Sequence, residues 1–114
     1  MLTMYAIPNC DTVKKARAFL DKKKIAYEFV DFKKTPPTKE LVNKWIDFLG
    51  ELPVNKKGTT FRKLKDEYET LSPSKQIDFM IANSSMIKRP ILENKNKTIA
   101  VGFDEEVYAG LKLG

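Results

Sequence analysis

Residues 2–32 contain the pattern that most restricts the fold. Residues 2–7 carry β-favouring side chains at both odd and even positions, as is typical of a strand covered on two sides. Apolar residues then recur at helical spacing from Val13 to Leu20 and predict a helix ending near Lys24. Residues 26–32 predict a second strand. This order normally joins two parallel strands by a right-handed crossover, so we expect an α/β protein.

The middle of the chain predicts helices. The Thr35-Pro36-Pro37-Thr38 stretch interrupts regular structure, and the apolar periodicity after it predicts an amphipathic helix that ends at Gly50. A short helix is expected within residues 55–65, with Thr59 as its N-cap. Ser72-Pro73 opens a further helix, because proline is tolerated at the first helical position.

The last part of the chain predicts two strands and a helix. Residues 91–93 and 98–101 flank a four-residue connection at 94–97, which fits a β-hairpin. A final helix follows Gly102-Phe103-Asp104. The chain of 114 residues is long enough to form one hydrophobic core, so we expect a single domain.

Histidine is absent and cysteine occurs once, at Cys10. These counts exclude a Ser-His-Asp or Cys-His catalytic pair, a histidine or multi-cysteine metal site and an internal disulfide. We therefore expect no bound metal. A single free thiol and the lack of a secretory or membrane-spanning pattern favour the cytoplasm.

The formal charge of +6 and the pI near 9.4 raise the question of nucleic-acid binding. Acidic residues are scattered among the basic ones, and residues 104–106 form an acidic cluster. No zinc-finger, RRM or KH signature is present. We interpret the lysines as a solvated surface and expect no nucleic-acid partner and no membrane partner.

Cys10 is the sharpest chemical feature. It falls between the first strand and the first helix, where free backbone N–H groups and the positive helix end stabilise a thiolate. Lys14, Lys15 and Arg17 follow within two turns. A lone cysteine is more often a small buried apolar residue. The strand-to-helix turn favours an activated thiol instead, because open α/β folds bind ligands at the carboxyl ends of their strands.

Two arginines stand where a cation is locally unfavourable. With Thr59 as N-cap, Arg62 would be the third helical residue, where the helix dipole favours a carboxylate. A solvated arginine is an equally good interpretation. Arg89 lies between apolar residues at the entry to a strand, so an anionic group should face it. Pro90 excludes helical geometry at Arg89.

Four ordered blocks of sequence resemble a known family. They are Tyr5-x-Ile7-x-Asn9-Cys10-Asp11-Thr12, Gly58-Thr59-Thr60-Phe61-Arg62-Lys63-Leu64, Ser85-Met86-Ile87-Lys88-Arg89-Pro90 and Val101-Gly102-Phe103. Together they resemble the arsenate reductase-like (ArsC/Spx) proteins of the thioredoxin superfamily, which include the Spx transcription regulators. The small YffB-type members look most similar.

The resemblance implies a thioredoxin-like fold, β-α-β plus β-β-α with a mixed sheet. Its core would comprise residues 1–37 and 86–114, with a helical insertion at about 38–85 and a cis Arg89-Pro90 bond. The implied catalytic residues are Cys10, Arg62 and Arg89. The implied substrate-binding residues surround them: Asn9, Asp11, Thr12, Lys14, Arg62, Arg89 and Pro90.

Two departures from the family pattern bear on function. Redox-switch members carry Cys-x-x-Cys, whereas Val13 stands at the second position here, so reduction needs an external thiol. Arsenate reductases of the glutathione-dependent type hold their oxyanion with three arginines. The third position falls near Gly102-Phe103, where there is none, unless Lys88 or Lys97 supplies the charge.

The resemblance therefore implies a monothiol reductase that uses no bound cofactor. Glutathione or another anionic thiol would be the co-substrate, and glutaredoxin or a protein disulfide a further partner. We expect a monomer. Two alternatives stay open: a regulator that binds RNA polymerase as Spx does, and an arsenate reductase.

Overall fold

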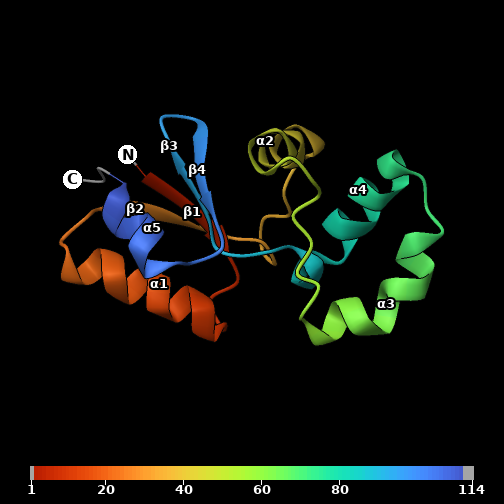
Figure 1. The fold of residues 1–114 in the computed structure, drawn as a ribbon, viewed down its shortest axis with the longest axis horizontal. Coiled ribbons are helices and arrows are strands. Elements are labelled where there is room, and N and C mark those ends of the chain that lie inside the picture. The colour runs from red at the N-terminus through yellow and green to blue at the C-terminus, as the bar shows by residue number, and fades with distance from the viewer. Residues whose placement is uncertain (1, 112–114) are drawn as a thin grey trace.

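The computed structural model describes residues 2–111, which form a four-stranded mixed sheet with helices on both faces (Figure 1). The elements follow one another along the chain in this order: β1 (Leu2–Ala6), α1 (Asp11–Lys22), β2 (Tyr27–Asp31), α2 (Lys39–Leu49), α3 (Thr59–Glu69), α4 (Pro73–Ala82), the 3-10 turn η1 (Ser84–Met86), β3 (Ile91–Asn94), β4 (Lys97–Val101) and α5 (Glu105–Gly110). The expected β-α-β start, central helices and β-β-α end are all confirmed.

The strand order in the sheet is β2-β1-β3-β4. β1 pairs with β2 in parallel, as the crossover predicts, and with β3 in antiparallel orientation. Tyr5 lies opposite Ile91 near the end of that second pairing. The segment that leaves β1 toward Cys10 and the segment that enters β3 from Arg89 therefore lie side by side at the same end of these two strands.

Each face of the sheet covers its own hydrophobic cluster. On one face, alternate residues of β1 pack with α1 and α5, and the members of this cluster include Met4, Leu20 and Tyr108. On the other face, α2 contributes Trp45, which is fully buried. Figure 1 shows α1 and α5 on one side of the sheet and α2 on the other, with α3 and α4 beyond it.

The helical insertion is joined to the core by a short backbone contact. The N–H of Asn55 donates to the carbonyl of Met86 at 2.7 Å, and the N–H of Lys88 donates to the carbonyl of Pro53 at 2.7 Å. Val54 and Ile87 form an isolated antiparallel bridge between these bonds. The loop after α2 is thereby held beside the segment that leads to Arg89.

Several local boundaries differ from the prediction, and α3 extends to Glu69, beyond the short helix expected within residues 55–65. The hairpin connection is two residues, Lys95 and Asn96, with φ of 52° and 66°, so β3 ends one residue later and β4 begins one residue earlier than the four-residue connection implied. Two consecutive left-handed residues fit the tight turn that matches strand twist. α1 ends at Lys22, because Lys24 adopts a left-handed φ of 58°. Gly58, not Thr59, is the N-cap of α3.

Glu93 is a buried carboxylate that ties α2 to the sheet. The residue is 3% exposed on β3, and its side chain accepts hydrogen bonds from Trp45 Nε1 at 3.1 Å and Lys44 Nζ at 3.2 Å. Thr98 Oγ1 on β4 donates to the same carboxylate at 3.3 Å. Because a buried charge is tolerated only when it is paired and hydrogen-bonded, these donors and Glu93 depend on one another.

We predict that Glu93→Ala lowers the free energy of unfolding by about 2 to 4 kcal/mol, because it leaves the buried Trp45 N–H without an acceptor. Lys44→Ala is the matched comparison and should cost about 1 kcal/mol or less, since the Lys44 side chain is 41% exposed. Urea denaturation of both variants measures the difference. Equal losses would show that the ion pair with Lys44, and not the hydrogen bond from Trp45, carries the contribution of Glu93.

Candidate functional site

Cys10 is the N-cap of α1, as the sequence predicted. Its backbone is extended, with φ −137° and ψ 129°, and its carbonyl accepts the first helical hydrogen bond from Lys14 N–H at 2.9 Å. The side chain is half-buried. The neutral thiol makes no capping hydrogen bond, so the N–H groups of the first helical turn remain available to a thiolate.

The surroundings of Cys10 lower the pKa of its thiol. Burial acts in the opposite direction and is the largest single influence. Three influences that lower the pKa outweigh burial when they are combined: hydrogen bonding from Val13 N–H, hydrogen bonding and charge from the Arg89 guanidinium, and hydrogen bonding from Thr12 N–H. The helix end and Arg89 therefore both favour the nucleophilic thiolate.

Arg89 is held in place by its own segment. Its Nη1 donates to the carbonyl of Ser85 at 2.8 Å and to the carbonyl of Ile87 at 3.1 Å. Its Nε is buried and has no hydrogen-bond partner in the part of the chain described. No carboxylate among residues 2–111 forms an ion pair with Arg89. The expected anionic partner is thus not supplied by these residues, and the guanidinium remains available to a ligand.

The Arg89-Pro90 bond is cis, as the resemblance implied, and Pro90 is buried directly before β3. The buried proline sets the start of the strand, and Arg89 precedes it at the rim of the site. Pro90 also accepts a hydrogen bond, through its carbonyl, from Gly102 N–H at 2.8 Å. This bond brings the Gly102 segment beside Arg89.

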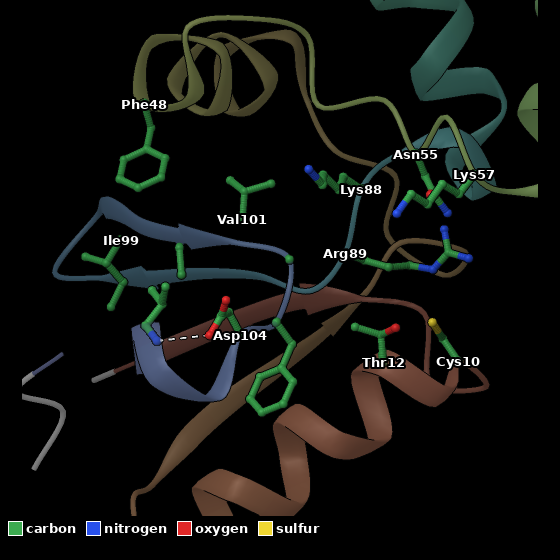
Figure 2. A pocket seen from close by; sticks show the side chains of 14 residues that line it. Cys10, Thr12, Phe48, Asn55, Lys57, Lys88, Arg89, Ile99, Val101 and Asp104 are labelled. Carbon is green, nitrogen blue, oxygen red and sulfur yellow. Dashed lines mark hydrogen bonds between the residues drawn. The ribbon is translucent and has the colours of Figure 1, made fainter. Parts of the chain in front are cut away.

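Cys10 and Arg89 line one cavity of about 530 Å³ (Figure 2). The cavity has a polar end near Cys10 and an apolar end along β4. Its wall is formed by residues from α1, α2, the loop after α2, the Arg89 segment, β4 and the start of α5: Cys10, Thr12, Phe48, Asn55, Lys57, Lys88, Arg89, Ile99, Ala100, Val101, Gly102, Phe103, Asp104 and Val107.

A second cavity of about 450 Å³ also includes Arg89. Asn9 lines it together with Pro8 from the turn before Cys10 and with Ser85. Arg89 therefore contributes to two hollows that adjoin the same strand-to-helix turn.

Only some of the other predicted site residues line these two cavities. Thr12 lines the first cavity and Asn9 the second, whereas Asp11 and Lys14 are exposed on α1 and line neither. Arg62 is exposed on the first turn of α3 and is outside both cavities. The structure thus brings Cys10 and Arg89 together but does not place Arg62 with them.

The helix that carries Arg62 begins one residue earlier than the capping pattern predicted. Because Gly58 is the N-cap, Arg62 is the fourth helical residue and Phe61 the third. A Cβ at residue 58 would lie 2.9 Å from Asn55 Nδ2, so a side chain at the cap would require the Asn55 side chain to shift. Arg62 therefore opposes the helix dipole less strongly than the sequence suggested.

Of the two lysines considered for the missing third arginine, Lys88 is the one at the site. It lines the cavity with Cys10, and its Cε is 3.8 Å from the Cβ position of Gly102. Lys97 begins β4 at the opposite end of the strand. Gly102 has a φ of 82°, which side chains rarely adopt, so an arginine at that position would be strained.

Sequence reasoning missed Asn55 and Lys57 at this cavity. Both lie in residues 55–65, which contain five basic and no acidic residues, but only the pairing of Asn55 with Met86 brings the start of that segment to Arg89. The family block at residues 58–64 begins directly after Lys57, but no local pattern distinguishes Lys57 from the other lysines.

The described residues contain no group of three or more histidine, cysteine or acidic side chains that could hold a metal ion. No helix within residues 2–111 is long and apolar enough to cross a membrane.

Comparison with known proteins agrees with this geometry. The model of the ArsC family matches residues 5–111. An uncharacterized protein of Haemophilus influenzae is 33% identical over 110 residues, which cover 95% of this chain and 96% of that protein. The global transcriptional regulator Spx of Streptococcus agalactiae is 30% identical over 109 residues, which cover 93% of this chain and 79% of the regulator.

Solved structures show the same fold. A YffB protein superimposes with a TM-score of 0.85 at 40% identity and full coverage of both chains. An arsenate reductase-related protein from Brucella melitensis gives a TM-score of 0.71 at 38% identity, covering 96% of this chain and 92% of that one. With a thioredoxin-like sheet, Cys10 capping α1 and a family match over almost its whole length, this chain belongs to the ArsC family.

Proposed function

We propose that this protein is a monothiol oxidoreductase that reduces mixed disulfides with glutathione. The observation that carries the proposal is the placement of the Cys10 thiol at the end of α1 beside the Arg89 guanidinium, in one cavity. A thiolate is the nucleophile in thiol-disulfide exchange, so a lowered thiol pKa suits this reaction.

The proposed reaction has two exchanges. The Cys10 thiolate attacks the glutathionyl sulfur of a mixed disulfide, the old S–S bond breaks, and the substrate leaves as a thiolate. A glutathione thiolate then attacks the glutathionyl sulfur bound to Cys10, which forms glutathione disulfide and regenerates the Cys10 thiolate. In sum, the mixed disulfide and one glutathione thiolate give the substrate thiolate and glutathione disulfide, so one S–S bond forms for each one that breaks.

Two features support glutathione as the thiol. Val13 occupies the position of a resolving cysteine and is fully buried, so the second exchange needs an external thiol. Arg89, with Lys57 and Lys88 in the same cavity, offers cations to the carboxylates of glutathione. Arg62 remains a proposed second arginine for such a carboxylate. Glutaredoxin is a further candidate partner for the regeneration step.

A transcription regulator is the second candidate, and the likeness to Spx proteins favours it. A pulldown from lysate separates the two. RNA polymerase subunits recovered equally by the parent and by Cys10→Ser would support the regulator. Disulfide-linked proteins that depend on Cys10 would support the reductase.

We predict that the alkylation rate of Cys10, measured against pH, gives an inflection below the ordinary cysteine pKa of about 8.5. Arg89→Gln should move the inflection to higher pH, because the thiolate loses a hydrogen bond and a nearby positive charge. Arg62→Gln is the matched control and should leave it unchanged. An unchanged inflection in Arg89→Gln would refute the role of Arg89.

We predict that Arg89→Ala weakens binding of S-methylglutathione by about 1.5 to 3 kcal/mol, the range for hydrogen bonds to charged groups. Arg62→Ala should weaken it by less, because Arg62 lies outside both cavities. Calorimetric titration of the two variants and of the double variant measures the coupling. Less than additive losses would indicate one shared carboxylate, and no loss in either variant would overturn the anion site.

We predict slow or no glutaredoxin-coupled arsenate turnover by the parent, because a lysine at position 88 does not reproduce the bidentate fork of arginine. Lys88→Arg should raise arsenate affinity, whereas Lys97→Arg should not, since Lys97 is at the far end of β4. Efficient arsenate reduction by the parent would contradict this prediction.

A further inference from the structure

Two large apolar side chains among the described residues are strongly exposed, and both line the cavity that contains Cys10. Phe48 on α2 is 48% exposed and Val107 on α5 is 50% exposed. Figure 2 shows Phe48 and Ile99 at the end of the cavity that lies away from Cys10. Exposed apolar groups that meet at one cavity indicate a binding surface more strongly than scattered ones do.

β4 forms the floor of this cavity and is an edge strand. It pairs with β3 on one side, and no strand within residues 2–111 pairs with its other side. Ile99, Ala100 and Val101 of β4 line the cavity. α2 covers one face of the sheet and α5 the other, so Phe48 and Val107 border the open edge from opposite faces.

The half of β4 that lies away from Gly102 is less suited to pairing with an added strand. The register of β4 with β3 shifts between Leu92 and Glu93, which leaves Ile99 as an extra residue in the ladder. Such an irregularity twists an edge strand and disfavours strand addition beyond it. The residues available for pairing are therefore those nearest Gly102 and Cys10.

The other end of the cavity is cationic. Lys57, Lys88 and Arg89 line it, and no ion pair within residues 2–111 involves any of the three. Asp104 is the acidic residue in the wall, and its Oδ1 caps α5 by accepting from the N–H groups of Glu106 and Val107. The charge of the cavity thus suits an anionic group beside Cys10.

Glutathione accounts for only part of this cavity. Its carboxylates fit the cationic end, but it has no apolar side chain to contact Phe48 or Val107. A protein segment carrying a glutathionylated cysteine has both parts: the glutathione carboxylates near the reacting sulfur and apolar side chains further along. Extended segments commonly add to an exposed sheet edge, with backbone bonds giving affinity and alternate side chains giving specificity.

We propose that the groove along β4 binds an extended segment of a glutathionylated protein, with its modified cysteine at Cys10 and two consecutive apolar side chains against Phe48 and Val107. The inference rests on the proposed function and specifies its substrate class. Consecutive strand side chains point to opposite faces, which matches the positions of Phe48 and Val107. Counting along β4 from Gly102, the residue nearest Arg89, to Ile99 gives three residues, so the proposal places the apolar pair about three and four residues from the cysteine, at roughly 3.3 Å per residue.

The test compares mixed disulfides of glutathione by the rate at which they yield glutathione disulfide. The probes are free cysteine and short blocked peptides with a central cysteine, with leucine or serine at the third and fourth positions on either side. For one of the two leucine arrangements, the parent should show a kcat/KM roughly tenfold above that of the serine peptide, because two apolar side chains become partly buried.

Phe48→Ser and Val107→Ser should each remove most of this preference and leave turnover of the cysteine-glutathione disulfide unchanged. Asp47→Ser and Ala109→Ser are matched controls, because both residues are exposed on the same helices and line no part of the cavity. Thermal unfolding of all four variants verifies that each one folds. Loss of leucine preference in the controls as well would overturn the proposal.

The outcomes separate this inference from the proposed function. If cysteine-glutathione disulfide is reduced but leucine and serine peptides react alike, the groove assignment is wrong and the monothiol function stands. If neither disulfide is reduced in a Cys10-dependent way, the function fails. The groove is then judged by fluorescence-anisotropy titration of the labelled leucine peptide onto Cys10→Ser. Binding that Phe48→Ser abolishes supports the groove, and no binding overturns it.

A second copy of the chain is the competing occupant. Analytical ultracentrifugation of the parent and of Phe48→Ser distinguishes it. A dimer that dissociates in Phe48→Ser would overturn the proposal, whereas a monomer in both variants supports it.

Discussion

The antiparallel pairing of β1 with β3 in the centre of the sheet is the constraint on which the site depends. Because Tyr5 pairs with Ile91, the segments carrying Cys10 and Arg89 emerge at the same end of these two strands although they are far apart in sequence. The parallel pairing of β1 with β2 fixes the direction of α1, whose first turn then points its N–H groups at the thiol. Hydrogen bonding in the sheet therefore creates the electrostatics of the site.

The site combines a rigid cation with a partly exposed thiol. Arg89 is fixed by two carbonyls of its own segment, so less conformational entropy is lost when it contacts a thiolate or a carboxylate. Its Nε has no partner among the described residues, which leaves hydrogen-bonding capacity at the rim. Burial opposes ionisation of Cys10, but the backbone donors and Arg89 prevail. The balance favours thiolate chemistry while keeping the sulfur accessible.

The helical insertion contributes to the site in two ways. Through Glu93 it holds α2 against β3 and β4, which positions Phe48 at the open edge of the sheet. Through the bonds between its loop and the Met86 segment it places Asn55 and Lys57 opposite Arg89. The cavity at Cys10 is thus assembled from the core and from the insertion, and changes in the α2 region should alter substrate selection more than thiol reactivity.

The sequence by itself determined the order of the elements, the position of Cys10 at a helix end and the absence of a resolving cysteine, because periodicity, capping and residue counts are local properties. It also indicated Arg89, since a cation beside Pro90 at a strand entry is locally unfavourable. Only the tertiary structure separated Arg62 from Lys57 and Lys88, and only it placed Phe48 and Val107 at one cavity. These residues come from segments whose proximity is set by strand pairing and by the docking of α2, which no local pattern encodes.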